Sequence, residues 1–428
     1  MADLKTLISL LDAKQNVFLT GGAGTGKTTL TREVIEYFTS EGKKVAKLAS
    51  TGMAATLIGG QTLHSFLDLG IADSIEELEL KGKLEVKKKV KNLVASMDLI
   101  IIDEISMVSA ALFEMIRLRL LQSGFKGTLL TVGDFLQLPP VVRGYGEINF
   151  AFESESWQRY AFETITLEIN HRSDDRDFVK VLDKVRFAEV GDDEHFYLHH
   201  LIKPVGEDLS QYTYLYGKNY SASRHNKEQL AFINSEEMLY TSQLIKHDKK
   251  TTDKEVERFL SDARIEPELR LKVGAPVLFT RNAWNYFNGE RGRIVRLSEE
   301  IVFVEKSEGV VVKLERASMA KTQWKERILE GHKEMVEESK FSVQQFPIVL
   351  AFAITIHKSQ GMSIEDLIIE TTEIFAPSQF YVALSRATSP HRLILKQPTT
   401  NWCNLAFVNS KALDFTMKNM TKGASDVG

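Results

Sequence analysis

A glycine-rich run that joins an apolar stretch to a helical pattern constrains this chain more than any other feature. Residues 21–28 (GGAGTGKT) fit the pattern G-x-x-x-x-G-K-[ST], and residues 17–19 before them are predicted to form the buried strand that this pattern requires. Glycines allow positive φ angles and bring backbone N–H groups close to phosphate oxygens. The sequence therefore predicts a phosphate-binding loop, here called the phosphate loop, followed by a helix that begins near Lys27.

The phosphate-loop pattern predicts roles for the polar side chains at the end of the loop. We expect Lys27 to reach the β- and γ-phosphates and Thr28 to hold Mg²⁺, while the helix N-terminus adds partial positive charge. The residues expected to contact the nucleotide are Gly22, Ala23, Gly24, Thr25, Gly26, Lys27, Thr28 and Thr29. A chance glycine-rich turn is the alternative interpretation, and the register of strand, loop and helix argues against it.

Two further apolar runs end in polar side chains. Residues 99–104 (LIIIDE) predict a central parallel strand that delivers Asp103 and Glu104 to the carboxyl edge of a sheet. We expect Asp103 to bind Mg²⁺ and Glu104 to orient the attacking water, whereas a strand end that merely faces solvent is the alternative. Residues 128–132 predict another strand, which leads into GDFLQLPPV, where Gln137 is expected to read the γ-phosphate or hold the water.

Length and composition describe an ordinary globular protein. The 428 residues suggest about three domains, and 43 % hydrophobic with 26 % charged residues fit neither a disordered nor a membrane protein. One cysteine excludes an intramolecular disulfide and a cysteine-rich zinc site. No stretch approaches a transmembrane span or a signal peptide, so a cytoplasmic protein is expected. Since the formal net charge is −4, any nucleic-acid binding must use local patches or a channel.

Two segments of the first half allow more than one interpretation. Residues 50–66 are rich in small residues, paired glycines and hydroxyls, which favours a loop that grips a backbone or a nucleotide. For His64 and Phe66, packing in the core beneath a loop and contact with a ligand are equally plausible interpretations. Residues 73–92 change from glutamates to lysines. They predict either a solvated charged helix face or an inserted element that separates strands or contacts phosphates.

The second half alternates helical and strand-like patterns. Arg172 lies at a strand-to-loop transition, where an arginine is most often part of a surface ion pair. Residues 273–280 and 293–305, continued through 310–314, predict a small antiparallel barrel. A charged, helix-prone segment is expected at 323–339.

The main sheet is expected to resume near Val349. His357 to Gly361 (HKSQG) would form a polar loop between a helical pattern and a strand. Residues 379–388 predict an amphipathic helix with Arg386 near its end, and residues 401–428 predict a mostly helical tail.

A set of motifs in this chain resembles the helicase motifs of the petite integration frequency (PIF) family, a RecD-like branch of superfamily one. They are GGAGTGKT, STGMAATLIGGQTLHSF, IIIDEISMV, VGDFLQLPPV, NHRS, AFAITIHKSQGMS and YVALSRAT, in family order and spacing from Gly21 to Thr388. The resemblance implies an α/β fold of two RecA-like P-loop domains, each a parallel sheet with flanking helices. It also implies a small wedge insertion in the first domain and an inserted SH3-like β-barrel in the second.

The resemblance further implies domain limits. These are 1–66 and 97–168 for the first RecA-like domain, 67–96 for the wedge element, 169–289 and 347–400 for the second RecA-like domain, 290–346 for the barrel, and 401–428 for a C-terminal tail. A chain of this extent is expected to be close to a minimal motor core.

The activity implied by the resemblance is ATP-driven movement on single-stranded DNA in the 5′-to-3′ direction, with displacement of the complementary strand. ATP and Mg²⁺ would lie between the two lobes, with Arg172 and Arg386 as arginine fingers and Gln137 coupling the phosphate state to lobe closure. The residues expected to line the DNA channel, mainly in contact with the DNA backbone, are Thr51, Gly52, His64, Thr355, His357 and Ser359, and the ring of Phe66 is expected to stack on bases. Forked DNA and guanine-quadruplex DNA are candidate substrates. DNA repair, DNA recombination and telomere maintenance are candidate cellular roles. The protein is expected to be a monomer.

One position departs from the family pattern. Relatives usually carry an adenine-reading glutamine in a leader before the first strand, and here Gln15, which we expect to contact the adenine, lies closer to that strand. Two alternative functions stay open: a DNA translocase that displaces proteins without separating strands, and a nucleotide-switched binding module. The second alternative predicts a guanine-reading N-K-x-D sequence, which the chain lacks.

Overall fold

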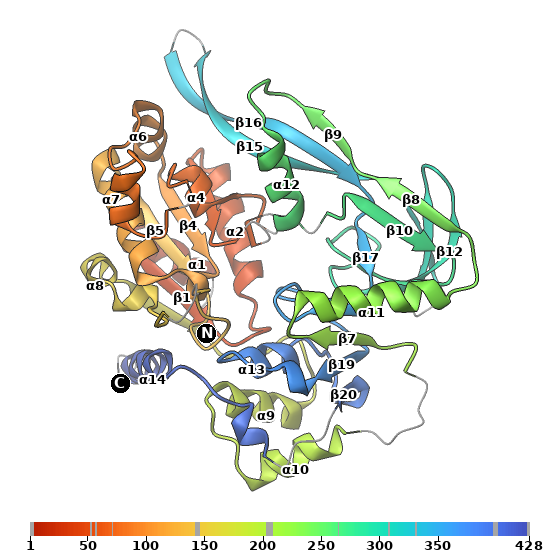
Figure 1. The fold of residues 1–428 in the computed structure, drawn as a ribbon. Coiled ribbons are helices and arrows are strands. Elements are labelled where there is room, and N and C mark those ends of the chain that lie inside the picture. Colours follow the sequence, from red (N-terminus) through yellow and green to blue (C-terminus); the bar gives the residue numbers. More distant parts are fainter. Residues whose placement is uncertain are drawn as a thin grey trace. The chain divides into compact units, whose positions relative to one another are not determined.

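The structure is a computed structural model, and its chain divides into two compact units (Figure 1). Unit 1 comprises Met1–His171, Lys321–Lys340 and Asn409–Gly428, and unit 2 comprises Arg172–Ala320 and Phe341–Val408. The residues that the structure describes are 4–51, 54–55, 58–70, 72–141, 146–202, 209–263, 265–306, 309–329, 332–396 and 401–425. Among these residues, no helix combines the length and the apolar character needed to cross a membrane.

Unit 1 is built on a six-stranded parallel sheet with the strand order β3-β2-β4-β5-β1-β6. Its strands are β1 (Val17–Gly21), β2 (Val45–Ala49), β3 (Gln61–Thr62), β4 (Leu99–Asp103), β5 (Thr128–Val132) and β6 (Glu163–Leu167). The inner strands β1, β4 and β5 are apolar runs that are buried along almost their whole length, as expected when helices cover both faces of a sheet. The three strands predicted around the nucleotide motifs are therefore confirmed.

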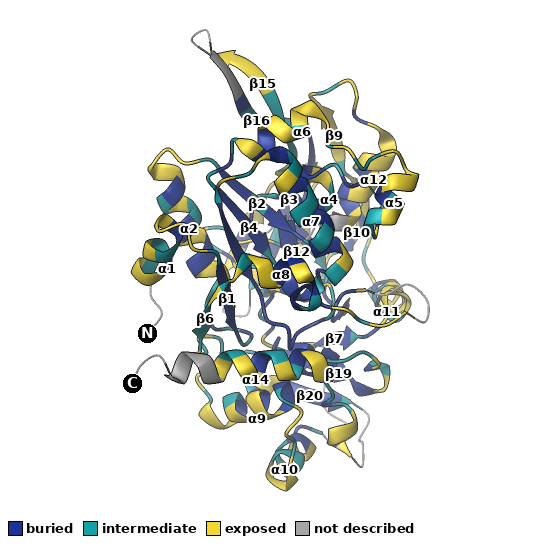
Figure 2. Cartoon of the chain, turned by 90° about the vertical axis from the view of Figure 1, so that its left-hand side faces the viewer, coloured by how far each residue is buried: buried dark blue, intermediate teal, exposed yellow. Residues whose placement is uncertain are grey.

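Helices pack on both faces of the unit 1 sheet. One face shares a core with α1 (Leu4–Asp12) and α2 (Lys27–Ser40), into which Val17 and Leu19 of β1 project. Because side chains alternate along a strand, Phe18 points to the other face, where its ring meets those of Trp157 and Phe415. The elements on that face are α7 (Ala110–Ser123), η2 (Ala151–Glu153), α8 (Glu155–Tyr160) and the C-terminal helix α14 (Ser410–Ser425). Figure 2 shows the buried strands and the exposed outer sides of α1, α2 and α14.

The wedge element contains two short helices, α5 (Ile75–Leu80) and α6 (Lys88–Ala95), and follows the single helical turn α4 (Leu63–Phe66). α6 buries Leu93 and Val94 and leaves the lysines of its first turn exposed. The exposed lysines agree with the interpretation of residues 73–92 as a charged helix face in contact with solvent. Strand separation by the wedge element stays a prediction.

Unit 2 contains a four-stranded parallel sheet with the order β18-β7-β19-β20. Its strands are β7 (Thr213–Tyr216), β18 (Ala353–Thr355), β19 (Leu367–Glu370) and β20 (Leu393–Lys396). Its helical elements are α9 (Arg176–Arg186), α10 (Asp192–His200), α11 (Asn219–Phe232), α13 (Gln379–Leu384), η3 (Thr371–Glu373), η4 (Pro390–Arg392) and η5 (Trp402–Asn404). The chain thus has two parallel sheets with associated helices, which is the α/β class expected of two RecA-like domains.

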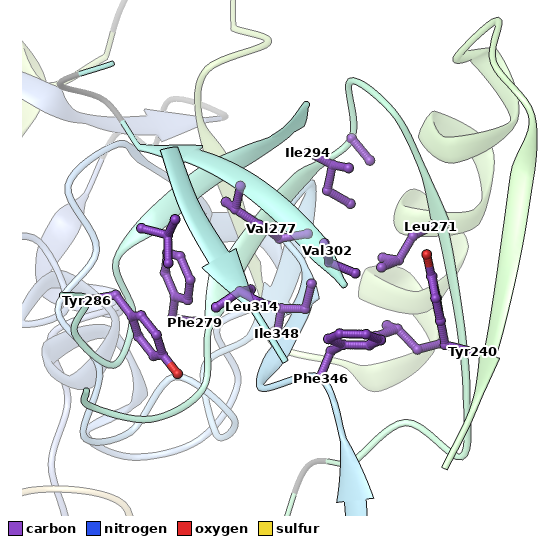
Figure 3. Packing of buried hydrophobic residues seen from close by; sticks show 14 of the residues in the cluster. Tyr240, Leu271, Val277, Phe279, Tyr286, Ile294, Val302, Leu314, Phe346 and Ile348 are labelled. Carbon is purple, nitrogen blue, oxygen red and sulfur yellow. The ribbon is translucent and has the colours of Figure 1, made fainter. Parts of the chain in front are cut away.

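The rest of unit 2 is antiparallel. A five-stranded sheet has the order β14-β13-β12-β11-β17, and its strands are β11 (Pro276–Phe279), β12 (Arg291–Leu297), β13 (Val302–Lys306), β14 (Val311–Leu314) and β17 (Ile348–Leu350). A two-stranded sheet of β8 (Glu237–Thr241) and β10 (Glu268–Lys272) contributes Tyr240 and Leu271 to the same apolar core (Figure 3). This core draws on strands from both sides of residue 290, including residues 276–279 within the stretch where the sequence pattern began the barrel. The barrel limits of 290–346 that the resemblance implies stay a prediction.

The segment expected to be helical at 323–339 is a β-hairpin instead. It consists of β15 (Ala317–Leu329) and β16 (His332–Gln345), with β16 also paired to β9 (Gln243–Lys246), which precedes α12 (Asp253–Asp262). Arg327 on β15 and Glu338 on β16 form a bidentate ion pair, with Nε to Oε1 at 2.6 Å and Nη2 to Oε2 at 2.8 Å. Helix propensities of charged residues differ by less than about 1 kcal/mol, so strand pairing overrides them here.

Candidate nucleotide site and nucleic-acid interface

The backbone of the phosphate loop adopts conformations that only glycine tolerates easily. Gly21, Gly24 and Gly26 have φ angles of 150°, 82° and 90°. A Cβ atom at Gly21 would lie 2.4 Å from the carbonyl oxygen of Leu167 and 2.7 Å from Thr25 Oγ1, so a larger residue does not fit. The loop predicted from the sequence therefore has the compact turn that phosphate binding requires.

Lys27 lies across the phosphate loop. Its ammonium group donates hydrogen bonds to the carbonyl oxygens of Gly21 and Gly22, both at 2.8 Å. The Thr25 hydroxyl donates to Gly22 O at 2.9 Å and so tightens the same turn. Lys27 is also the first residue of α2, where Thr28 and Thr29 are exposed, so the positive end of this 14-residue helix opens at the loop.

Asp103 ends β4 at the carboxyl edge of the sheet, as the sequence predicted. Burial raises the pKa of the Asp103 carboxyl above its ordinary value, while the Glu104 N–H, which donates to Asp103 Oδ1 at 2.8 Å, and the charges of Lys27 and Arg32 act in the opposite direction. Asp103 therefore lies within electrostatic range of Lys27, although β5 lies between β4 and β1, the strand that leads into the phosphate loop. The sequence did not single out Arg32; its position on α2, five residues after Lys27, was the available signal.

Glu104 occupies the left-handed region of the backbone, with φ 51° and ψ 48°, directly before η1 (Ile105–Met107). A non-glycine residue in this region costs about 1–2 kcal/mol. Strain of this kind concentrates at functional sites because surrounding contacts hold a side chain in a required direction. The conformation agrees with a special role for Glu104 at the end of β4.

The donor set around Asp103 suits Mg²⁺ rather than a metal held by protein alone. Within the described part of the chain, no group of three or more histidine, cysteine, aspartate or glutamate residues could hold a metal ion. The Thr28 hydroxyl and the Asp103 carboxylate are hard oxygen donors, and Mg²⁺ commonly uses one or two protein ligands together with water and substrate phosphates. These two residues therefore fit the metal that the sequence predicts.

Gln137 is buried in the turn after β5, and a carboxylate holds it there. Its side-chain amide donates to Asp134 Oδ2 at 3.3 Å, and Asp134 Oδ1 accepts a hydrogen bond from the Leu136 N–H at 3.1 Å. Asp134 is 1 % exposed and was missed as a site residue, although it belongs to the same GDFLQ motif. The structure thus provides a positioning residue for Gln137.

The two arginines expected to act as fingers lie together in unit 2. Arg172 donates from Nε to Ser363 Oγ at 3.0 Å and from its guanidinium to the Ser385 carbonyl oxygen at 2.7 Å. Arg386 directly follows Ser385 in the chain. It is 2 % exposed and donates to the carbonyl oxygens of Val382 and Ser359 at 2.9 and 3.3 Å. Burial lowers the pKa of Arg172, but an arginine keeps its charge in proteins. Neither arginine is an ordinary exposed ion-pair residue.

Among the residues expected to bind DNA in unit 1, only some side chains reach the surface. Thr51 and His64 are half-buried, and Thr51 Oγ1 accepts a hydrogen bond from the Ala54 N–H at 3.2 Å. Phe66 is 3 % exposed. The expectation that Phe66 stacks on bases is therefore wrong, because α4 turns this ring into the core. Gly52 lies outside the described residues.

The expected DNA-binding residues of unit 2 show a similar division. Ser359 is fully buried and its hydroxyl donates to Ile356 O at 2.8 Å, while Thr355, 4 % exposed, accepts from the Lys358 N–H at 3.2 Å. The expectation that these two side chains contact DNA is wrong, because their hydroxyls close the turn internally. His357 is half-buried, and burial lowers the pKa of its imidazole; Lys358 is exposed and was not among the expected contacts.

Gln15 lies at the opposite edge of the unit 1 sheet from the phosphate loop. It is exposed in the turn before β1, at the amino edge of the sheet, whereas the phosphate loop follows β1 at the carboxyl edge. A five-residue strand spans about 16 Å at its usual rise, so Gln15 cannot reach the phosphates. The adenine is at the other end of ATP from the γ-phosphate, and the expected contact between Gln15 and the adenine stays a prediction.

Comparison with known proteins agrees with this geometry. Residues 6–190 match the family model described as PIF1-like helicase. The ATP-dependent DNA helicase Pif1 of Campylobacter jejuni is 38 % identical over 430 residues, which cover 95 % of this chain and 95 % of that protein.

Two solved structures are similar as well. The crystal structure of Bacteroides sp Pif1 in complex with ADP-AlF4 is 28 % identical, with a TM-score of 0.85 over 99 % of this chain and 97 % of that one. The crystal structure of Bacteroides Pif1 bound to ssDNA has the same identity and coverage and a TM-score of 0.66. The phosphate loop, the acidic end of β4 and these likenesses together show that the chain belongs to the PIF1-like helicase family.

Proposed function

We propose that this chain is an ATP-dependent DNA helicase that moves along single-stranded DNA in the 5′-to-3′ direction and displaces the complementary strand. Family membership supports the reaction, because similar proteins are named ATP-dependent DNA helicases. The observation that carries the proposal is the gathering of Lys27, Asp103 and the strained Glu104 at one edge of the unit 1 sheet. These three groups supply phosphate binding, metal binding and water activation.

In the proposed mechanism the ammonium of Lys27 exchanges its hydrogen bonds to Gly21 O and Gly22 O for the β- and γ-phosphates of ATP. Thr28 and Asp103 would hold Mg²⁺, which neutralises phosphate charge when bound. Glu104 orients the attacking water, and Gln137, held by Asp134, senses the γ-phosphate. The loop residues from Gly22 to Gly26, with Thr29, contribute backbone N–H groups.

Arg172 and Arg386 are proposed to stabilise the charge on the transferred phosphoryl group. Both lie in unit 2 on one hydrogen-bonded network, so a change in one affects the placement of the other. Their reach to a nucleotide held by unit 1 would make hydrolysis depend on closure of the two lobes, which is how ATP use would drive steps along DNA.

The proposed DNA contacts use Thr51, Gly52 and His64 in unit 1, and in unit 2 His357, the exposed Lys358 and the backbone that Thr355 and Ser359 shape. Backbone contacts must dominate because a motor cannot depend on base sequence. The wedge element, with its exposed lysines, would meet the fork. Forked and guanine-quadruplex DNA as substrates, a monomeric state, a cytoplasmic location and roles in repair, recombination and telomere maintenance belong to the same proposal.

Steady-state ATP hydrolysis tests the proposal. Wild type, Lys27→Ala and Glu104→Gln are compared with and without a single-stranded oligonucleotide. We expect strong stimulation by DNA in wild type, loss of hydrolysis in both variants, and retained ATP binding in Glu104→Gln. Hydrolysis that is indifferent to DNA would contradict a DNA motor. DNA-stimulated hydrolysis without unwinding of a forked duplex would instead indicate a translocase that does not separate strands.

A further inference from the structure

The loop between β11 and β12, residues 280–290 (TRNAWNYFNGE), presents aromatic rings to solvent and is here called the aromatic loop. The side chain of Trp284 is 94 % exposed and that of Phe287 is 66 % exposed. Tryptophan is usually well buried, so a ring at this level of exposure calls for an explanation. Neither ring takes part in the nucleotide site or in the DNA contacts proposed above.

The aromatic loop is held in one shape by its own contacts. The Ala283 N–H donates to Tyr286 O at 2.8 Å, which places Trp284 at the tip of a tight turn. Tyr286 anchors the loop, because its ring is 8 % exposed and stacks on Phe279 with 4.3 Å between centroids and 15° between planes (Figure 3). The Asn288 N–H donates to Asn282 Oδ1 at 2.7 Å. Trp284 is therefore presented by a preorganised turn.

Charges around the aromatic loop favour an anionic partner. Arg281 is exposed at its start. The carboxylate of Glu290 at its end is engaged, since it accepts a hydrogen bond from the Phe287 N–H at 3.0 Å and forms an ion pair with Lys306 at 2.9 Å. Among the residues of the aromatic loop, the exposed charge is thus positive.

The end of the aromatic loop packs on residues 362–363, which closely follow the turn proposed to contact DNA. A Cβ atom built at Gly289, whose φ is +90°, would lie 2.6 Å from Ser363 O and 2.9 Å from Met362 Cβ, so the two backbones touch there. Ser363 Oγ accepts the hydrogen bond from Arg172, and Met362 O accepts one from Arg386 at 3.4 Å. The end of the loop therefore lies against the segment that accepts hydrogen bonds from Arg172 and Arg386.

We propose that Trp284, with Phe287 nearby on the same loop, is a stacking platform for an unpaired base of single-stranded DNA. Stacking on an indole is tolerant of base identity, because every base has a π face, and an exposed cation beside the ring suits the phosphate backbone. This inference rests on the proposed helicase function. It adds a base contact to a track otherwise made of backbone contacts, on a loop whose end packs against the segment that accepts hydrogen bonds from Arg172 and Arg386.

The experiment measures binding of two fluorescent oligonucleotides of equal length, one of normal thymidines and one with abasic sites. The variants are Trp284→Ala and Trp284→Phe, with Phe196→Ala as the matched control, because Phe196 is an exposed aromatic residue on α10 of the same unit, 67 % exposed. We expect Trp284→Ala to raise the Kd for the normal oligonucleotide about tenfold, and Trp284→Phe and Phe196→Ala to leave it within about threefold of wild type.

The abasic oligonucleotide separates stacking from loop damage. If Trp284 stacks on a base, wild type should lose affinity for the abasic oligonucleotide and Trp284→Ala should lose little more, so the two proteins bind it about equally. Hydrolysis of ATP without DNA should be the same in both proteins.

Equal binding of the normal oligonucleotide by wild type and Trp284→Ala would overturn the inference and point to a protein partner for this loop, while leaving the helicase function intact. A defect in Trp284→Ala that persists on the abasic oligonucleotide would also overturn it, since the loop would then act without a base. If wild type neither binds single-stranded DNA nor is stimulated by it, the proposed function itself fails.

Discussion

Glu104 shows how a single residue can be held against its backbone preference. Its φ of 51° is unfavourable for any residue with a Cβ atom, and the strain is absent in glycine. We expect Glu104→Gly to be more stable than Glu104→Ala by about 1 kcal/mol, measured by urea unfolding. Both variants lack the carboxylate, so both should lose ATP hydrolysis. Equal stability of the two would mean that Glu104 leaves the left-handed region once its side chain is removed.

Arg172 and Arg386 should each matter for both turnover and stability. Both variants to alanine should slow ATP turnover by about a thousandfold if each side chain stabilises the transferred phosphoryl group. Both should also lose about 1–3 kcal/mol of stability, because Arg172→Ala removes the hydrogen bonds to Ser363 Oγ and Ser385 O and Arg386→Ala removes those to Val382 O and Ser359 O. Turnover assays and urea unfolding separate the two effects. Arg270→Ala is the control, since Arg270 forms only exposed ion pairs.

At the scale of elements, a buried arginine of α7 donates several hydrogen bonds to the wedge element. Arg119 is 1 % exposed and donates hydrogen bonds to the carbonyl oxygens of Leu67, Lys83 and Leu84. Arg119→Ala should lower the free energy of unfolding by about 2–4 kcal/mol and raise hydrogen exchange within residues 67–96.

Arg117 lies on the same helix and is only half-buried, so Arg117→Ala serves as the control for this prediction. It should change stability by less than about 0.5 kcal/mol. Equal effects of the two variants would show that the wedge element does not depend on the Arg119 hydrogen bonds.

The C-terminal helix α14 is part of unit 1 and not a loose tail. The Phe415 ring stacks on Phe152 with 4.2 Å between centroids and meets Phe135 at 5.3 Å, directly beside the Asp134 that holds Gln137. Phe415→Ala should cost about 2–3 kcal/mol of stability, measured by urea unfolding, since it removes a partly buried ring from an aromatic cluster. Met417→Ala on the same helix, at a residue 47 % exposed, should cost far less.

For the whole molecule, strand polarity is the property that distinguishes a directional helicase from a strand-indifferent ATPase. We expect a duplex with a 5′ single-stranded tail to be unwound much faster than the same duplex with a 3′ tail, because a motor that grips the sugar–phosphate backbone reads its chemical direction. Strand displacement with both substrates measures this, and Lys27→Ala is the inactive control. Faster unwinding from the 3′ tail would contradict the proposed direction.

Much of the nucleotide site could be predicted from the sequence because its parts are local. The phosphate loop, the acidic end of β4 and the turn that carries Gln137 each follow an apolar strand within a few residues, and parallel strands bring their carboxyl ends to one edge. Asp134 and Arg32 were missed because their partners become visible only when β5 and α2 are placed in three dimensions.

The predictions that failed depended on which way a side chain faces. Phe66 and Ser359 sit in motifs expected to touch DNA, yet short turns direct both into the interior. The segment 323–339 has helix-forming charged residues, and its strand partners lie outside any local window.

The sequence by itself determined the fold class, the family resemblance and the chemistry at the carboxyl edge of the first sheet, because each rests on residue types at short, fixed spacings. Only the tertiary structure decided the burial of Arg119 and Phe66, the strand pairing of β15 and β16, and the packing of α14 on unit 1. Burial and strand pairing are set by residues distant in the chain, whose contacts outweigh local propensities of less than about 1 kcal/mol per residue.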